Sequence, residues 1–316
     1  MTLSPAPYRI TFPTDPHGIV YRKTAREHGI TDNQLARAVD QGHLRRIWPG
    51  AFLPSSTVLE HEALHRVRTI AAMTCSTTDH VASHTSAAVL HGLSMLMPDL
   101  GRVHQRTGTA TGGRVDSYRH LHSGVLDESD VVLVDGFPTT SLELTAIDLA
   151  CGVGEFARAL AVFDSALRLG ADAEAMAESL ERRRTGVGLA RFALGHANGL
   201  SENPGESWGR GQMIVEHLPL PILQRVYLDE RGEFVARCDY DWEGKLVGEF
   251  DGKVKYQKLL KPGEDVTAVV VREKRREDAV RRLGPMVERW VWTDLVRNVM
   301  IPRLTHNLQT VGILKK

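Results

Sequence analysis

The stretch CDYDWEGKLVGEFDGKVKY, residues 238–256, restricts the fold more than any other part of the chain, because its carboxylates follow a strand-like pattern. Aromatic and β-branched residues around them are typical of strands. Side chains alternate along a strand, so Asp239 and Asp241 share one face of a first strand, and Glu249 and Asp251 share one face of a second. A half-buried hairpin that gathers like charges needs a compensating group.

The length of the turn decides whether the two acidic faces coincide. An even loop pairs Asp239 with Gly248, whereas an odd loop over residues 243–245 pairs Asp239 with Glu249. A left-handed glycine at position 244 favours the odd loop, which places the two carboxylate side chains opposite each other. Mg²⁺ would neutralise them, since it takes oxygen ligands, activates water and stabilises charge on a phosphoryl group. The alternative is a solvated face neutralised by Lys245, Lys253 and Lys255.

The N-terminal segment GIVYRKTAREHGITDNQLARAVDQGHLRRIWPGAFLP predicts a helix-turn-helix followed by a hairpin. A first helix ends near Gly29, and Thr31 or Asp32 can cap a second helix that ends at Gly42. We expect Gln34, Arg37 and Gln41 on the exposed face of the second helix, and Arg45 and Arg46 on the hairpin, facing DNA phosphates. Helix packing without a role in DNA binding is the alternative.

These residues resemble the N-terminal winged-helix domain of AbiEi-type antitoxins, in which a helix-turn-helix leads into an "RRxxxGxF/Y" wing. The resemblance covers the segment up to about residue 55 and continues more loosely beyond it. It implies a DNA-binding domain at this end of the chain.

Residues 201–295 resemble the PD-(D/E)xK nuclease superfamily, in particular the compact branch related to very-short-patch-repair endonucleases. The shared order is a helix glutamate, "RxD", "ExDG", a basic "KRRED" helix and an "ERWVWTDL" ending. The resemblance implies that Glu206 matches the helix acid, Asp239 the first metal ligand and Glu249 the second. The superfamily is a group of metal-dependent nucleases, so Mg²⁺, with Mn²⁺ as a substitute, is the implied cofactor.

This chain departs from the superfamily at Asp251, which stands where the superfamily has its lysine. The "ExD" variants of this branch imply that Asp251 is a further metal ligand. The missing positive charge would then come from Lys253 or Lys255, with Lys274 as a third candidate. The residues expected to bind phosphate are those of the basic helix and include Lys274, Arg275, Arg276, Arg281 and Arg282.

The formal net charge of zero, from 39 basic and 39 acidic residues, hides a segregation of charge. Residues 18–50 and 253–303 carry about twice as many basic as acidic side chains, and residues 121–184 are predominantly acidic. Two basic ends suit two surfaces that face nucleic acid, although charge runs are also ordinary solvated helix faces. Three widely spaced cysteines suggest neither a disulfide framework nor a zinc knuckle.

The remaining patterns complete a multidomain α/β and α+β fold. We expect a winged-helix domain over residues 1–57, a mixed α/β connector over 58–200, and a restriction-endonuclease-like mixed sheet flanked by helices over 201–316. His80, His84 and His91 recur among apolar residues, which favours structural histidines over a metal site. The apolar runs are too short to span a bilayer, and we expect a cytoplasmic protein without membrane contact.

The sequence therefore predicts a DNA-binding, Mg²⁺-dependent endonuclease, and the resemblances imply a role in genome defence or repair. A non-catalytic AbiEi-like antitoxin or transcriptional regulator is the first alternative. A toxin-neutralising protein that uses the acidic middle is the second. The partners expected are DNA and a toxin or other defence-system protein, and a homodimer is left open.

Overall fold

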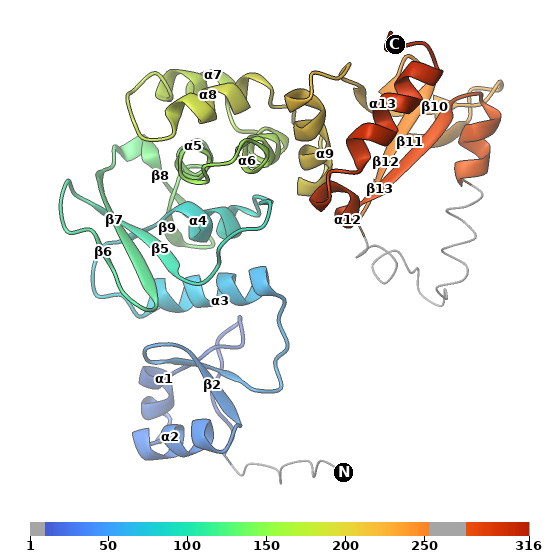
Figure 1. Cartoon of the computed structure of the whole chain (residues 1–316). Helices are drawn as coiled ribbons and strands as arrows, with labels where there is room; N and C mark the ends of the chain where they lie inside the picture. Colours follow the sequence, from blue (N-terminus) through green and yellow to red (C-terminus); the bar gives the residue numbers. More distant parts are fainter. Residues whose placement is uncertain (1–9, 253–275, 316) are drawn as a thin grey trace. The chain divides into compact units, whose positions relative to one another are not determined.

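The computed structural model describes residues 10–252 and 276–315 (Figure 1). The chain divides into two compact units. The first comprises Met1–Leu93 and Pro98–Thr145, and the second comprises Ser94–Met97 and Ala146–Lys316. The fold is a mixed α/β arrangement with sheets of three, six and four strands in its described part, as expected from the sequence.

The first unit begins with two short helices and a hairpin. Its elements are β1 (Val20–Tyr21), α1 (Arg22–Glu27), α2 (Asp32–Asp40), β2 (Leu44–Trp48) and β3 (Ala51–Pro54). The three strands form a sheet in the order β1-β3-β2. Helix α2 begins where the sequence predicts, because the Thr31 hydroxyl accepts from the Gln34 amide while the Gln34 side chain accepts from the Thr31 amide, a capping box. Leu35 and Ala38 of α2 pack on Phe52 of β3 in a small core.

The rest of the first unit is a six-stranded sheet packed with two helices. The helices are α3 (His61–Thr74) and α4 (His84–His91). The strands are β4 (Val81–Ala82), β5 (Val103–Gly108), β6 (Arg114–Val115), β7 (Arg119–Val125), β8 (Val131–Val134) and β9 (Phe137–Thr140), in the order β6-β7-β5-β4-β9-β8. A single core joins Trp48 of the hairpin, Ile70 of α3 and Val103 of β5, so the N-terminal elements and this sheet fold as one unit.

The second unit joins a group of helices to a four-stranded mixed sheet. Its helices include α5 (Leu142–Gly152, which starts in the first unit), α6 (Phe156–Arg168), α7 (Ala173–Ser179), α8 (Val187–Gly195), α9 (Pro204–Val215), α12 (Trp292–Val296) and α13 (Met300–Thr310). The strands β10 (Ile222–Leu228), β11 (Phe234–Trp242), β12 (Leu246–Asp251) and β13 (Met286–Val291) lie in that order, antiparallel except for the parallel pair β12–β13. The division near residue 145 differs from the boundary predicted at 200/201.

Glycines in α9 let this helix approach its neighbours closely. A Cβ on Gly205 would stand 2.1 Å from Cε1 of Phe250, and a Cβ on Gly209 would stand 3.1 Å from Nε1 of Trp290. Gly211 faces the opposite way, toward Ala157 of α6. Helix α9 therefore packs against the sheet on one side and against α6 on the other.

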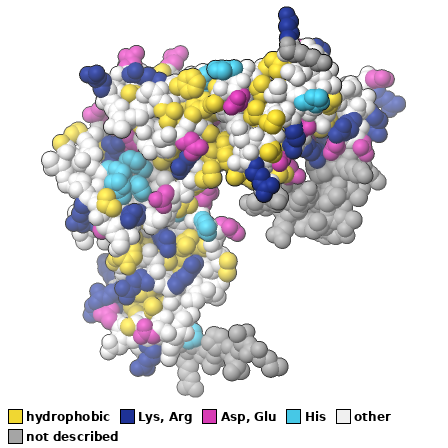
Figure 2. Space-filling model, in the orientation of Figure 1, with side chains coloured by type: hydrophobic (Ala, Val, Ile, Leu, Met, Phe, Trp, Pro, Cys, Tyr) yellow, Lys and Arg dark blue, Asp and Glu magenta, His cyan; other side chains and the backbone are white. Residues whose placement is uncertain are grey.

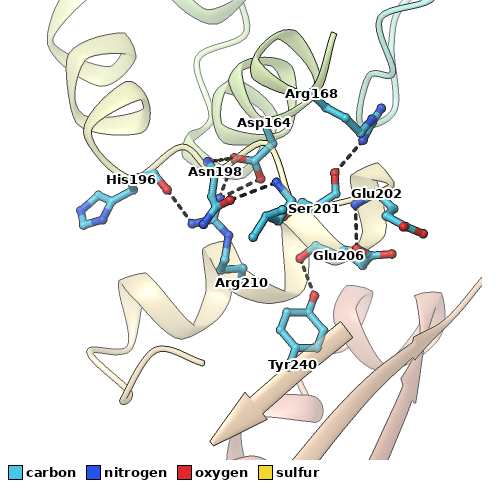
Figure 3. Close-up of polar contacts among 10 residues, drawn as sticks. Asp164, Arg168, His196, Asn198, Ser201, Glu202, Glu206, Arg210 and Tyr240 are labelled. Carbon is cyan, nitrogen blue, oxygen red and sulfur yellow. Dashed lines mark hydrogen bonds and ion pairs between the residues drawn. The ribbon is translucent and has the colours of Figure 1, made fainter. Parts of the chain in front are cut away.

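A buried ion pair fastens α9 to α6 (Figure 3). The Arg210 guanidinium donates to both carboxylate oxygens of Asp164, at 2.6 and 2.8 Å, and to the His196 carbonyl at 2.5 Å. Asp164 also accepts from the Asn198 amide at 2.7 Å. The residue exposures of Asp164 and Arg210 are 0% and 5%, so this pair is removed from water and well supplied with hydrogen bonds.

Candidate functional site

The carboxylate hairpin has the register that the odd loop predicts. Strands β11 and β12 pair Trp242 with Leu246 and Tyr240 with Gly248, leaving residues 243–245 as the loop. Gly244 has a φ of 68°, the left-handed conformation expected of it. The pairing of the two strands ends at Tyr240 and Gly248, one position before Asp239 and Glu249, and beyond it Asp239 Oδ2 accepts from the Phe250 amide at 2.8 Å. The prediction of an odd loop is confirmed.

Glu249 forms ion pairs with arginines. Its side chain lies in β12 and the residue is 7% exposed. Oε2 of Glu249 lies 2.6 Å from Nη2 of Arg289 and 3.2 Å from Nη2 of Arg276. Arg289 is the partner of Glu249 in the parallel register between β12 and β13, and it also contacts Glu277 at 3.3 Å. Two guanidinium groups therefore compensate a carboxylate for which the sequence predicted a metal ion.

Asp241, in contrast to Asp239 and Glu249, stabilises the fold of the hairpin. It is fully buried, and its carboxylate accepts from Nη1 of Arg225 at 2.6 Å, from the Tyr227 hydroxyl, and from the Gly244 amide at 3.1 Å. Burial, together with the bond to this carboxylate, raises the pKa of Tyr227. Asp241 thus links the hairpin loop to β10, and the acidic pattern of β11 contains one residue for the site and one for the fold.

Glu206 and Asp251, the two other carboxylates of the predicted site, lie at a helix start and at a strand end. The Glu206 carboxylate, in the first turn of α9, accepts from the Glu202 amide at 2.7 Å, from Nδ2 of Asn203 at 2.5 Å and from Nε2 of Gln224 at 3.1 Å. Its carbonyl accepts from the Tyr240 hydroxyl at 2.6 Å (Figure 3). Asp251 is half-buried in the last position of β12.

The described carboxylates do not converge as a set of three. Within residues 10–252 and 276–315, the only group of three ligand atoms close enough to hold one metal ion is formed by His84, His104 and His122. Asp239 and Glu249 remain as two carboxylates on neighbouring strands, and Mg²⁺ in proteins is commonly held by one or two carboxylates with water completing its shell.

Cys238 lies next to Asp239 but is no nucleophile. Burial, and secondarily Glu249, raises the pKa of this thiol to about 12, so it is protonated at neutral pH.

The predicted basic residues have three different outcomes. Lys253, Lys274 and Arg275 lie outside the described residues, as do Lys255 and the strand predicted over 266–271. Arg276 begins a described helical segment over residues 276–282, but it contacts Glu249 and is not directed only to solvent. Arg281 pairs with Glu277 along the same segment at 2.8 Å.

The predicted DNA-facing residues of the first unit also differ from one another. Arg37 and Arg46 are exposed, and the Arg46 guanidinium lies 5.7 Å from the ring centre of Phe52. Arg45 is half-buried and donates to the Thr57 carbonyl at 3.0 Å. Gln34 is half-buried, and its amide oxygen accepts from the Thr31 amide in the capping box.

Sequence reasoning missed two features of these units. The arginine partners of Glu249 depend on the parallel pairing of β12 with β13, which no local pattern reveals. The histidine group combines two strands and a helix. Its one local signal is that His120 and His122 alternate along a strand, but the contribution of His104 follows only from strand register.

The arrangement defines a multidomain α/β protein with a paired-carboxylate hairpin in its second unit. No protein-family model matches the chain. Two Mycobacterium tuberculosis proteins, the uncharacterized protein MT2308 of strain CDC 1551 / Oshkosh and the uncharacterized protein Rv2248 of strain ATCC 25618 / H37Rv, are each 30% identical to it over 274 residues. The match spans 78% of this chain and 93% of each relative, and the chain belongs to the family of these proteins.

One solved structure is also similar. The crystal structure of RV2827C protein from Mycobacterium tuberculosis has a TM-score of 0.39 and 15% sequence identity, over 69% of this chain and 84% of that chain. No helix in the described ranges combines the length and the apolar character needed to cross a membrane.

Proposed function

We propose that this protein binds DNA through its N-terminal helices and hairpin, and that its second unit hydrolyses nucleic-acid phosphodiesters with Mg²⁺ or Mn²⁺. The observation that carries the proposal is the three-residue hairpin loop together with the bond from the Phe250 amide to Asp239 Oδ2, which places Asp239 beside the strand that carries Glu249. Carboxylates gathered in a sheet are costly unless a cation compensates them. Genome defence or repair is the setting that the nuclease and antitoxin resemblances imply.

The hairpin offers the oxygen ligands that a hard divalent cation takes. Asp239 and Glu249 would hold the ion, with Asp251 at the end of the same strand as a further ligand and Glu206 on α9 nearby in the implied set. When bound, the ion would lower the pKa of a coordinated water and stabilise charge on the phosphoryl group. Lys253 is the residue proposed to supply the positive charge that Asp251 displaces from the usual position.

In this proposal, Arg289 and Arg276 move from the Glu249 carboxylate to a phosphate of the substrate. Each guanidinium now contacts the Glu249 carboxylate. A nucleic-acid phosphate offers two anionic oxygens that a guanidinium can bind in a bidentate manner, as it binds a carboxylate. Substrate phosphate would therefore draw these arginines away from Glu249 and leave its oxygens for the ion.

Cleavage assays on a Glu249→Gln variant test the activity. The wild-type protein should nick or cut plasmid DNA in Mg²⁺ or Mn²⁺ and lose this activity in EDTA, and the variant should lose at least about a hundredfold in rate because a metal ligand is gone. Glu243→Gln is the matched control, since Glu243 lies in the loop of the same hairpin, is exposed and forms an ion pair with the exposed Lys245. Its rate should be unchanged.

A second candidate function is a non-catalytic DNA-binding regulator of AbiEi antitoxin type. It is favoured by the ion pairs of Glu249 with Arg289 and Arg276, and by Asp251 at the lysine position. If wild type and Glu249→Gln are equally inactive on duplex DNA, single-stranded DNA and RNA with either metal, this function replaces the nuclease. A toxin or other defence-system protein would then be the partner to identify.

DNA binding by the first unit is tested separately, through the salt dependence of binding. We expect Arg46→Ala to weaken binding to duplex DNA and to reduce the slope of log K against log salt by about 1, because one phosphate contact is lost. Arg45→Ala should leave the slope nearly unchanged and lower the melting temperature instead, since Arg45 is half-buried and bonded to Thr57.

Fluorescence anisotropy with a labelled duplex at several salt concentrations measures both slopes. A slope that is the same for wild type, Arg46→Ala and Arg37→Ala would remove the DNA-binding proposal for this surface.

A further inference from the structure

Four histidines gather on one face of the first unit, remote in sequence from the carboxylate hairpin. His104 lies in β5, His120 and His122 lie in β7, and His84 is the first residue of α4. Strands β5 and β7 are parallel and pair His104 with His120 and Arg106 with His122, so these side chains share a face. Figure 2 shows histidine side chains gathered in one patch on this unit.

The imidazole rings are in contact. Nδ1 of His104 lies 2.9 Å from Nε2 of His122. The rings of His84 and His122 stack at 3.7 Å between centroids, and those of His120 and His122 also stack at 3.7 Å. One ring nitrogen from each of His84, His104 and His122 lies within 4.8 Å of the other two.

The surroundings keep the rings neutral. Burial, with smaller contributions from neighbouring histidines, lowers the pKa of His104 to about 4 and that of His122 to about 3, and it lowers the pKa of His84 well below its usual range. A neutral imidazole has a free lone pair, which is the form that binds a metal ion.

Serine hydroxyls contact the ring of His84 and the backbone of His104. Ser83 Oγ lies 3.1 Å from Nδ1 of His84, which leaves Nε2 of that ring for another partner. Ser86 Oγ accepts from the His104 amide at 2.9 Å and contacts Nε2 of the buried His65 at 2.9 Å. Polar groups that orient ligand side chains in this way are a regular part of metal sites.

We propose that His84, His104 and His122 bind one divalent transition-metal ion of the kind that prefers imidazole, such as Zn²⁺, Co²⁺ or Ni²⁺. Three protein ligands leave a fourth position for water or an anion. The nearby Arg106, which contributes to the lowered pKa of His84 and His122, favours an anion at that position.

Binding requires a modest rearrangement of the rings. Two nitrogens bound tetrahedrally at 2.0–2.1 Å from Zn²⁺ are about 3.4 Å apart, so His104 and His122 would separate slightly. The His84 ring would turn out of its stack toward them. All of this is rotation about side-chain bonds, because the three ligands are already carried by paired strands and a helix start.

The ion would join α4 to β5 and β7 and stabilise the first unit. Ligand binding to the folded state alone raises the melting temperature, and an ion at a hundredfold excess over its Kd should raise it by about 5–10 °C. This site differs in chemistry from the proposed carboxylate site, since three imidazoles disfavour Mg²⁺. The inference does not depend on the proposed nuclease activity.

The test uses the full chain without an affinity tag, treated with a chelator and desalted. Titration with Co²⁺ followed by visible absorbance should show one equivalent bound, Zn²⁺ should displace it, and Mg²⁺ should not. His104→Ala and His122→Ala should each lower the affinity for Co²⁺ at least about tenfold and abolish the metal-dependent rise in melting temperature. His61→Ala and His306→Ala, at exposed helix positions, are the matched controls and should bind as wild type does.

His84→Asn is a second ligand variant in case loss of a strand histidine disturbs folding, and circular dichroism checks each variant. An unaltered single equivalent of tightly bound Co²⁺ in all three ligand variants would overturn the site. So would a wild-type protein that binds no Co²⁺ or Zn²⁺, which would leave the rings as stacked packing groups.

Discussion

Replacing Arg210 with methionine is expected to lower the free energy of unfolding of the second unit by about 3–5 kcal/mol. The substitution leaves Asp164 as a charge without its partner in a place where its exposure is 0%. The carboxylate would lose the guanidinium of Arg210 and keep the hydrogen bond from the Asn198 amide. The His196 carbonyl also loses its donor.

Urea denaturation followed by tryptophan fluorescence measures this loss. Lys245→Met is the matched control, because Lys245 and Glu243 form an ion pair with side-chain exposures of 50% and 64%, and such surface pairs contribute about 0–1 kcal/mol. The double variant Asp164→Leu with Arg210→Met should recover much of the stability, since it removes both buried charges. If the single variant Arg210→Met is as stable as the wild type, the Asp164–Arg210 ion pair does not stabilise the packing of α9 on α6.

Replacing Gly205 with alanine is expected to destabilise the second unit by about 1–3 kcal/mol, because the new methyl group overpacks the core. It would stand 2.1 Å from Cε1 of Phe250, whose ring is itself buried against α9. Either α9 or Phe250 must move. Movement of Phe250 would also shift its neighbour Glu249, so cleavage activity should fall together with stability.

Gly188→Ala is the control for the intrinsic effect of alanine in a helix. No atom lies within 4 Å of a Cβ built at Gly188 in α8, and alanine has the higher helix propensity, so this change should be neutral or stabilising by up to about 1 kcal/mol. In thermal unfolding, Gly205→Ala should lower the melting temperature, whereas Gly188→Ala should raise it or leave it unchanged. Equal small shifts would show that α9 does not need its close approach to the sheet.

The hairpin of the candidate site was predictable because its determinants are local. The bounds of β11 and β12 follow from alternating apolar residues, and the register follows from a three-residue loop with glycine at its centre. The capping box at Thr31 and Gln34 also follows a local rule, because a Thr followed three residues later by Gln is a sequence signature of a helix start.

Features that depend on distant pairing were not predictable. Arg289 reaches Glu249 because β13 pairs in parallel with β12, across a long intervening segment whose path the sequence pattern does not determine. The histidine site has the same origin, since His84, His104 and His122 belong to three elements. Residues 58–200 were predicted as one connector, whereas the buried contact of Asp164 with Arg210 joins α6 to α9 within the second unit.

The two-sided packing of α9 has a consequence for how this chain can be divided or recombined. A fragment that starts at residue 201 would contain Arg210 without Asp164, and would expose the side of α9 on which Gly211 meets Ala157. We therefore expect such a fragment to be unstable on its own. A gene fusion or domain exchange that keeps the carboxylate hairpin folded must also include α6 and the loop that supplies His196 and Asn198. The smallest segment that can be transferred is therefore larger than the segment that resembles a nuclease.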